Sequence, residues 1–232
     1  MEKDYFDLEN RNCMAYYQDH PKILLIQPVD EHDLKILDRQ AELIVSGVKI
    51  PFLLAAFRVS DWNRELSPWP APAVFGKNDF GDGAPETLRF IESRLLPFLL
   101  DRFGLSAEMP LIPGGYSLAG LFALWSVFRS DRFKAAAAAS PSVWFRGWLD
   151  YAVSHQPHAD YVYLSLGDKE EKTKNPQMAA VGSCIRSQLE LLQAQGIPCE
   201  LEWNEGNHFR DPEIRMAKGF IKCIKAVLPE TS

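Results

Sequence analysis

A serine stands between small residues in the segment Gly115–Ala119, which reads Gly-Tyr-Ser-Leu-Ala. A short apolar stretch precedes this segment and a longer one follows it, so a strand leads in and a helix leads out. Gly-x-Ser-x-small in that setting is typical of a nucleophile elbow, a turn so sharp that bulky neighbours two residues away would clash. The turn exposes the Ser117 hydroxyl and leaves the Leu118 N–H free at the helix start for an oxyanion. We therefore predict Ser117 as a nucleophile and Leu118 as an oxyanion donor.

A serine hydroxyl is a weak nucleophile and needs a general base. Of the five histidines, His208 is the best placed, because it lies in a polar loop between the last predicted strand and the last predicted helix. Loops at the carboxyl ends of parallel strands are where such sheets carry their sites. Taken alone, His208 would be interpreted as a surface histidine in a polar turn rather than as a base. His155 and His158 share a polar segment but lack a third ligand, so no metal site is predicted.

The base in turn needs a carboxylate that orients it. The predicted strand Tyr161–Leu166 ends in Gly-Asp-Lys-Glu-Glu, which offers Glu170 and, closer to the strand, Asp168. We place the acid in this loop, with Glu170 as the first choice and Asp168 as the alternative. Serine, acid and histidine then follow three separate strands, which is the chain order of α/β-hydrolases.

A second oxyanion donor is expected in the loop that follows the first central strand. That loop begins Gln-Pro-Val-Asp-Glu, and Pro28 has no N–H. The backbone N–H of Val29 is therefore our candidate.

The elements that would position these residues alternate along the chain. Short apolar runs bounded by Pro, Gly, Asp or Asn predict buried strands at Ile23–Gln27, Phe52–Phe57, Pro110–Pro113, Lys134–Ala139, Tyr161–Leu166 and Cys199–Trp203. Longer amphipathic or apolar segments predict helices at Leu34–Val45, Pro85–Phe103, Leu118–Phe128, Gln177–Gln195 and Asp211–Val227. This alternation predicts a three-layer α/β fold, a mostly parallel sheet with helices on both faces. We expect one domain over residues 1–232.

Two segments interrupt the alternation, Arg58–Gly83 and Ser140–Trp148, and both are rich in aromatic residues. A loop as long as the first usually covers a site or carries function. Trp62 and Trp144 lie in loops that follow the carboxyl ends of predicted strands, at the same edge of the sheet as Ser117. We predict that they line a substrate pocket together with Tyr116. The alternative for the two tryptophans of the long loop, Trp62 and Trp69, is a purely structural role in which both cap the core.

Composition excludes several other classes of protein. The 232 residues are 47% apolar and 24% charged, which is ordinary globular composition, and the net charge is −6. A mildly acidic chain is a poor binder of nucleic acid and of anionic membranes. The polar, acidic start does not resemble a signal peptide, and the four scattered cysteines favour free thiols over disulfides. We expect a cytoplasmic protein that needs no metal or organic cofactor.

Several motifs resemble a known family, the putative esterases that include esterase D and the enterochelin (ferric siderophore) esterases. The resemblance runs from about residue 23 onward. Its matching pieces are Arg64–Pro68, Phe90–Phe98, Gly115–Leu124, Ser140–Trp144 and Gly206–His208. The family implies the α/β-hydrolase fold, with Ser117 as nucleophile and His208 as base. Departures are Tyr116 where His is frequent, Ala119 where Gly is usual, and Gln27-Pro28 where Asp-Gly often ends the first strand.

These observations predict a serine hydrolase that acts on a small-molecule carboxylic ester through an acyl-enzyme. A non-catalytic binding protein of the same fold is the alternative from a different class. A thioesterase or a peptidase would use the same three side chains.

Overall fold

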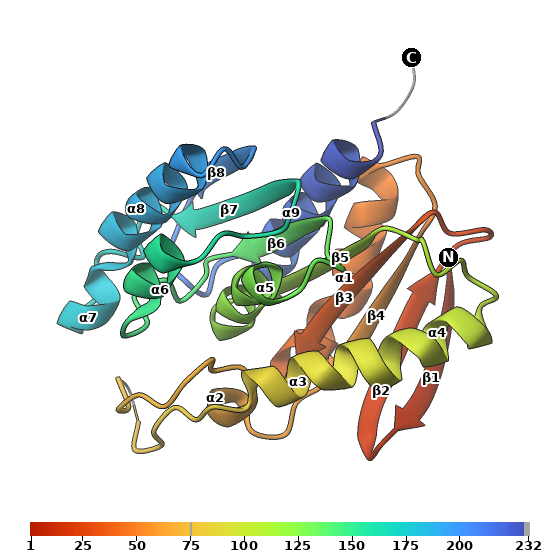
Figure 1. The fold of residues 1–232 in the computed structure, drawn as a ribbon, viewed down its shortest axis with the longest axis horizontal. Helices are drawn as coiled ribbons and strands as arrows, with labels where there is room; N and C mark the ends of the chain where they lie inside the picture. The colour runs from red at the N-terminus through yellow and green to blue at the C-terminus, as the bar shows by residue number, and fades with distance from the viewer. Residues whose placement is uncertain (75, 230–232) are drawn as a thin grey trace.

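An eight-stranded sheet runs through the centre of the protein (Figure 1). This computed structural model describes residues 1–74 and 76–229. The strands are β1 Glu2–Leu8, β2 Arg11–Tyr17, β3 Ile23–Val29, β4 Phe52–Arg58, β5 Leu111–Tyr116, β6 Ala135–Ala139, β7 Tyr161–Gly167 and β8 Cys199–Asn204. The helices are α1 Glu31–Gly47, α2 Trp62–Glu65, α3 Ala84–Phe90, the π-helix η1 Ile91–Leu95, α4 Leu96–Arg102, α5 Leu118–Arg129, α6 Trp148–Ser154, α7 Pro176–Ala179, α8 Val181–Ala194 and α9 Pro212–Val227.

The strand order is β1-β2-β4-β3-β5-β6-β7-β8, and β3 to β8 are joined by parallel pairing. The predicted α/β class with a mostly parallel sheet is confirmed. The hairpin β1–β2 was not predicted, and it adds two antiparallel pairings at one edge. Its strands are partly exposed and polar, so they lack the apolar run that reveals a buried strand. The turn at Glu9 and Asn10, both with positive φ, is the local signal for it.

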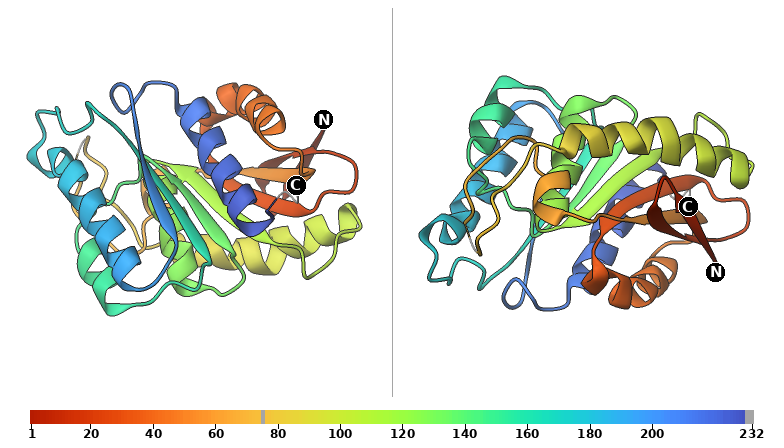
Figure 2. Two further views of the ribbon diagram at one scale, coloured as in Figure 1. Left: turned by 90° about the horizontal axis from the view of Figure 1, so that it is seen from above. Right: turned by 90° about the horizontal axis from the view of Figure 1, so that it is seen from below.

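Helices cover both faces of the sheet, as Figure 2 shows from above and below. Helices α1 and α9 pack on one face, and α3, α4, α5, α6 and α8 pack on the other, each around its own apolar cluster. The central strand β6 consists of five alanines, all fully buried. Such small side chains let the helices on both faces approach closely. At Gly219 of α9, for example, an added Cβ would lie 3.3 Å from the Cβ of Ala137.

Two predicted helices are divided in the structure. The segment Pro85–Phe103 contains α3, η1 and α4, because Pro97 lacks the N–H that an unbroken α-helix would use there. The π-turn just before it accommodates this change of hydrogen-bonding pattern. The segment Gln177–Gln195 divides at Ala180 into α7 and α8. The short helices α2 and α6 were not predicted.

The parallel strands bring the ends of β5, β6, β7 and β8 to one edge of the sheet. Ser117 follows β5, Glu170 lies just after β7, and His208 lies between β8 and α9. The fold therefore gathers at this edge residues that are up to 91 positions apart in the chain. Within residues 1–74 and 76–229, no helix is both long and apolar enough to cross a membrane.

Candidate active site

Ser117 occupies a strained turn between β5 and α5. Its backbone has φ 57° and ψ −119°, a region that L-residues rarely adopt outside constrained sites. The small neighbours are required sterically: a Cβ on Gly115 would lie 2.3 Å from the backbone carbonyl of Ala119. The turn is held from the sheet side, since the Ser117 N–H donates to the Ala139 carbonyl at 3.1 Å. The sequence pattern thus forms the elbow geometry that it predicts.

A continuous line of hydrogen bonds leads away from the Ser117 hydroxyl. Ser117 Oγ lies 3.0 Å from Nε2 of His208, and Nδ1 of the same ring lies 2.7 Å from Oε2 of Glu170. The His208 side chain is 25% exposed and that of Glu170 only 4%, so the line runs from a solvent-accessible ring into the interior. This is the arrangement that lets a histidine take a proton from a serine while a carboxylate holds its tautomer.

Glu170 is fixed by donors on its other oxygen. Oε1 accepts hydrogen bonds from Ser140 Oγ at 2.7 Å, from the Gly167 N–H at 2.7 Å and from Arg215 Nη1 at 2.8 Å. Burial acts to raise the pKa of Glu170, but the hydrogen bond and charge of His208 and the donors Ser140 and Gly167 outweigh it. The pKa of Glu170 therefore lies below its ordinary value, and the group is a carboxylate at neutral pH.

Asp168, the alternative acid, contacts the backbone of the histidine loop. Its Oδ1 accepts a hydrogen bond from the Gly206 N–H at 2.7 Å, and its own N–H donates to the Asn204 carbonyl. Of the two predicted carboxylates, Glu170 is the one hydrogen-bonded to the imidazole of His208. Asp168 instead ties the end of β7 to the loop that carries His208.

The two predicted oxyanion donors lie in different surroundings. Leu118 is the first residue of α5, so its N–H is among those that a helix leaves without an internal acceptor. Val29 is the last residue of β3 and is fully buried, and the residue that reaches the cavity beside Ser117 is Asp30. The Asp30 N–H already donates to Oδ2 of Asp33 at 3.2 Å. Val29 as the second donor stays a prediction.

A cavity of about 850 Å³ opens over the Ser117 hydroxyl. Trp62, Trp144 and Tyr116, the three predicted pocket residues, all line it. Trp69 lies elsewhere, where its indole N–H donates to the Arg146 carbonyl and its ring packs on the Phe145 ring. The other residues lining the cavity are Asp30, His32, Asp33, Ile36, Ser117, Ser140, Glu170, Met178, Val181, His208, Phe209 and Pro212.

A family model described as "Putative esterase" matches residues 56–212, which is more than half of the chain. The chain belongs to this esterase family. It is therefore an ester-bond hydrolase, and the family resemblance read from its motifs is confirmed. No match was found among curated proteins.

Solved structures similar to this esterase share its fold at low sequence identity. An IroE-like serine hydrolase from Shewanella oneidensis has a TM-score of 0.79 at 17% identity, over 95% of this chain and 79% of that one. The siderophore hydrolase EstB from Aspergillus nidulans has a TM-score of 0.71 at 18% identity, over 99% and 96%. The enterobactin esterase FES from Shigella flexneri has a TM-score of 0.68 at 13% identity, over 97% of this chain but 59% of that one.

The α1 side of the esterase's cavity is acidic. Asp30 caps α1, and Asp30 and Asp33 form a reciprocal capping box in which each side chain accepts the other's backbone N–H. Burial, followed by the nearby charge of Asp30, raises the pKa of Asp33 to about 7. The described residues that line the cavity include carboxylates and two imidazoles but no Lys or Arg.

Sequence reasoning missed two residues that contact the acid of the esterase, Arg215 and Ser140. Arg215 lies in the first turn of α9 and is 1% exposed, and its guanidinium pairs with Glu170. A usable signal existed, because Arg215 falls on the same helical stripe as Gly219 and Cys223, which face the core. A cation on a core-facing stripe needs a buried partner. Ser140 belongs to the Ser-Pro-Ser motif, for which the sequence analysis gave no role.

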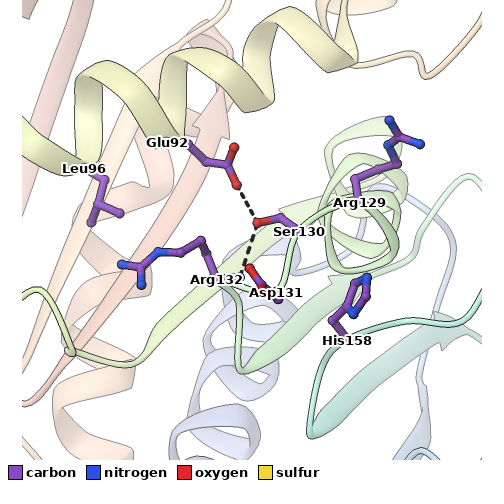
Figure 3. A pocket seen from close by; sticks show the side chains of 7 residues that line it. All are labelled: Glu92, Leu96, Arg129, Ser130, Asp131, Arg132 and His158. Atoms are coloured by element: carbon purple, nitrogen blue, oxygen red, sulfur yellow. Dashed lines mark hydrogen bonds between the residues drawn. The ribbon is translucent and has the colours of Figure 1, made fainter.

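A second hollow lies at the opposite end of α5, away from Ser117 (Figure 3). There the Ser130 hydroxyl donates to Glu92, a residue of η1, and accepts from the Arg132 N–H at 3.3 Å. Arg129, Asp131 and His158 are exposed around it. The hydroxyl faces a carboxylate rather than an imidazole, so this hollow lacks the nucleophile–base pair found at Ser117.

Among the described residues, no three His, Cys, Asp or Glu side chains converge as a metal-binding set. All four cysteines are free, with Cys13 and Cys223 buried and Cys184 and Cys199 half-buried.

Proposed function

We propose that this esterase hydrolyses its substrate through a Ser117–His208–Glu170 triad and an acyl-enzyme intermediate. The observation that carries the proposal is the unbroken line from the Ser117 hydroxyl through both ring nitrogens of His208 to a buried carboxylate. Ring orientation and distances suit general-base catalysis, which needs a heavy-atom separation of about 2.6–3.2 Å. The elbow supplies the exposed hydroxyl, and Glu170 supplies the fixed charge.

In the first half-reaction, Ser117 Oγ attacks the ester carbonyl carbon while its proton passes to Nε2 of His208. The carbonyl oxygen becomes an oxyanion, which the N–H of Leu118 and our second candidate, Val29, would stabilise. The C–O bond to the alcohol then breaks, and His208 returns the proton to the departing oxygen. Glu170 stays ionised and stabilises the imidazolium that forms between these steps.

In the second half-reaction, a water molecule repeats the attack on the acyl-serine. His208 takes a proton from the water, and the tetrahedral intermediate then expels Ser117 Oγ, which recovers a proton from the imidazolium. The products are a carboxylic acid, an alcohol and the free enzyme. Every proton transfer in this scheme uses His208, and none requires a cofactor.

We infer that the substrate is a small-molecule ester that is uncharged or cationic around the reacting carbonyl. Trp62, Trp144 and Phe209 offer aromatic surface to such a molecule. An anionic group would instead meet Asp30 and Asp33 without a Lys or Arg among the described lining residues. Two of the structural neighbours are a siderophore hydrolase and an enterobactin esterase, so siderophore esters belong in the test panel.

The nucleophile is tested with a fluorophosphonate probe followed by peptide mapping. We expect one modified residue, Ser117, and complete loss of labelling and of ester turnover in Ser117→Ala. Ser142→Ala is the matched control, because Ser142 is buried and its Oγ lies 3.5 Å from that of Ser117. That variant should retain the label. Labelling that survives Ser117→Ala would refute the proposed nucleophile.

A panel of ester, thioester and amide substrates with one shared acyl group separates the remaining alternatives. We expect the ester to be hydrolysed fastest. Preference for the thioester or the amide would reassign the reaction, and a folded protein with neither labelling nor turnover would favour a binding role.

A further inference from the structure

Arg215 contacts the proposed acid, Glu170, directly and the backbone of the loop that carries the proposed base, His208. It lies in the first turn of α9, and its side chain is 1% exposed. Its Nη1 lies within hydrogen-bonding distance of three side-chain oxygens, those of Glu170 at 2.8 Å, Tyr116 at 3.0 Å and Ser140 at 3.2 Å. Its Nη2 donates to two backbone carbonyls, those of Asn207 at 3.0 Å and Glu205 at 3.2 Å. One planar group therefore joins β5, the segment after β6, the loop after β7 and the His208 loop.

The contacts divide the two oxygens of Glu170 between different tasks. Oε1 is occupied by Arg215, Ser140 and the Gly167 N–H, whereas Oε2 faces Nδ1 of His208. A carboxylate held by three donors on one oxygen cannot rotate without losing them. The three donors that bind Oε1 therefore fix the direction in which Oε2 points, which is toward the imidazole of His208.

The imidazole is held by the same group through the backbone. Arg215 binds the carbonyl of Asn207, the residue just before His208, and the Tyr116 hydroxyl donates to the carbonyl of His208 itself at 2.8 Å. Tyr116 also accepts from Arg215. A shift of the guanidinium would therefore move the acid and the base together.

Charge adds a second reason for an arginine at this position. Glu170 is 4% exposed, and an uncompensated carboxylate at that depth is strongly disfavoured. The Arg215 cation at 2.8 Å compensates it. A lysine would supply the charge, but its single ammonium lacks the planar fork that reaches a carboxylate, two hydroxyls and two backbone carbonyls.

We propose that Arg215 is the positioning residue of this active site, holding Glu170 and the His208 loop in register and balancing the Glu170 charge. The inference rests on the proposed Ser117–His208–Glu170 mechanism and extends it to a residue that neither contacts Ser117 nor lines the cavity. A buried ion pair can also be purely structural, and replacing one by apolar side chains is often neutral for stability. The test therefore needs a readout that stability alone does not move.

That readout is the pH dependence of kcat/KM, measured per active site after fluorophosphonate titration. In Arg215→Met, the Glu170 charge is uncompensated and favours the protonated imidazole, which cannot act as a base. We expect the acidic limb of the profile to move up by about one pH unit. We also expect kcat to fall by about 10²-fold with KM changed little, because the hydrogen bonds that orient Glu170 and the His208 loop are lost.

Arg215→Lys separates charge from bridging. It keeps the cation, so we expect the acidic limb to stay at the wild-type pH while kcat still falls by about tenfold. Lys218→Met is the matched control, since Lys218 lies on the same helix and pairs with Glu202 of β8 without contacting Glu170. That variant should keep the wild-type kcat and pH profile. If Arg215→Met does not fold, Ser140→Ala removes a neutral donor from the same oxygen, and its acidic limb should move the same way by a smaller amount.

Unchanged acidic limbs in Arg215→Met and Ser140→Ala, with kcat per titrated site equal to wild type, would overturn the inference and leave Arg215 a structural residue. This outcome is distinct from failure of the proposed function. A wrong mechanism would show itself in the wild-type chain, as absent labelling of Ser117 or as activity in Ser117→Ala.

Discussion

Among the carboxylates that line the cavity above Ser117, Glu170 and Asp33 have pKa values that their environments shift in opposite directions. Glu170 has a pKa held below its ordinary value, whereas the pKa of Asp33 is raised to about 7. Burial pushes both groups toward the neutral form. Glu170 overcomes it with three donors on one oxygen and His208 on the other. Asp33 has one backbone N–H and the negative charge of Asp30 close by.

The difference shows that depth in the protein does not by itself decide whether an acid is charged. Hydrogen-bond donors and neighbouring charges decide it together with burial. One side of the cavity is thus built around a permanent charge, and the other carries a group that changes charge near neutral pH. Changing each carboxylate to its amide tests this contrast, because the amide removes the charge and keeps the shape.

The largest effect is expected on the permanently charged side. Glu170→Gln should lower kcat by about 10⁴-fold, because an amide no longer holds His208 in the productive tautomer. Asp168→Asn is the control carboxylate in the same loop, and its effect should be much smaller since it contacts the backbone of Gly206. Initial rates on a chromogenic ester give both values. The reverse order would transfer the acid role to Asp168, and equal small effects would indicate a Ser–His dyad.

This ordering also shows how far the sequence alone could go. The strand that ends before Glu170 was visible as an apolar run, and the order of Ser117, Glu170 and His208 fitted the α/β-hydrolase pattern. The sequence favoured Glu170 but could not decide against Asp168, because only Lys169 separates them and the turn geometry determines which carboxylate faces His208. Sequence spacing does not specify that geometry.

Arg215 illustrates a second limit of sequence reasoning. Its partners come from four separate segments, and no local pattern connects them. The hairpin β1–β2 was not predicted for a different reason. Its strands are partly exposed, and such strands do not need the apolar composition that marks a buried strand. The central strands and their helices were visible because burial on both faces demands apolar residues throughout.

An intermediate effect is expected where the aromatic residues face the substrate. Trp62→Ala and Trp144→Ala should each change the ratio of kcat/KM between aryl and small alkyl esters by about tenfold, the scale of a lost apolar pocket contact. Their melting temperatures should fall by only a few degrees. Trp69→Ala is the control, because Trp69 packs on the Phe145 ring outside the cavity. It should lower the melting temperature and leave the preference among esters intact. If all three variants lose stability and keep the wild-type preference among esters, Trp62 and Trp144 have a structural role and do not bind substrate.

The smallest effect is expected on the side that changes charge. With a folded pKa of about 7 against an ordinary 3.8, Asp33 keeps its proton in the folded state where the unfolded chain has lost it. Stability therefore falls as pH rises through this window, and the full cost is present above pH 7. Asp33→Asn keeps an acceptor for the Asp30 N–H and cannot ionise. Its melting temperature should exceed that of the wild type by a few degrees at pH 8 and not at pH 4.

Glu42→Gln provides the comparison for that measurement, because Glu42 is exposed on the same helix. Its melting temperature should follow the wild type at both pH values. A gain in Asp33→Asn that is equal at pH 4 and pH 8 would show that ionisation of Asp33 is not its cause.

The strained backbone of Ser117 has a consequence for how this chain could change over many generations. At φ 57° and ψ −119°, glycine would have less backbone strain than serine. Selection for hydrolysis and selection for stability therefore favour different residues at this position. A lineage released from the need to cleave esters would drift toward glycine there while keeping its fold. Glycine at the matching position of a relative would therefore indicate a protein that has kept the fold and lost ester hydrolysis.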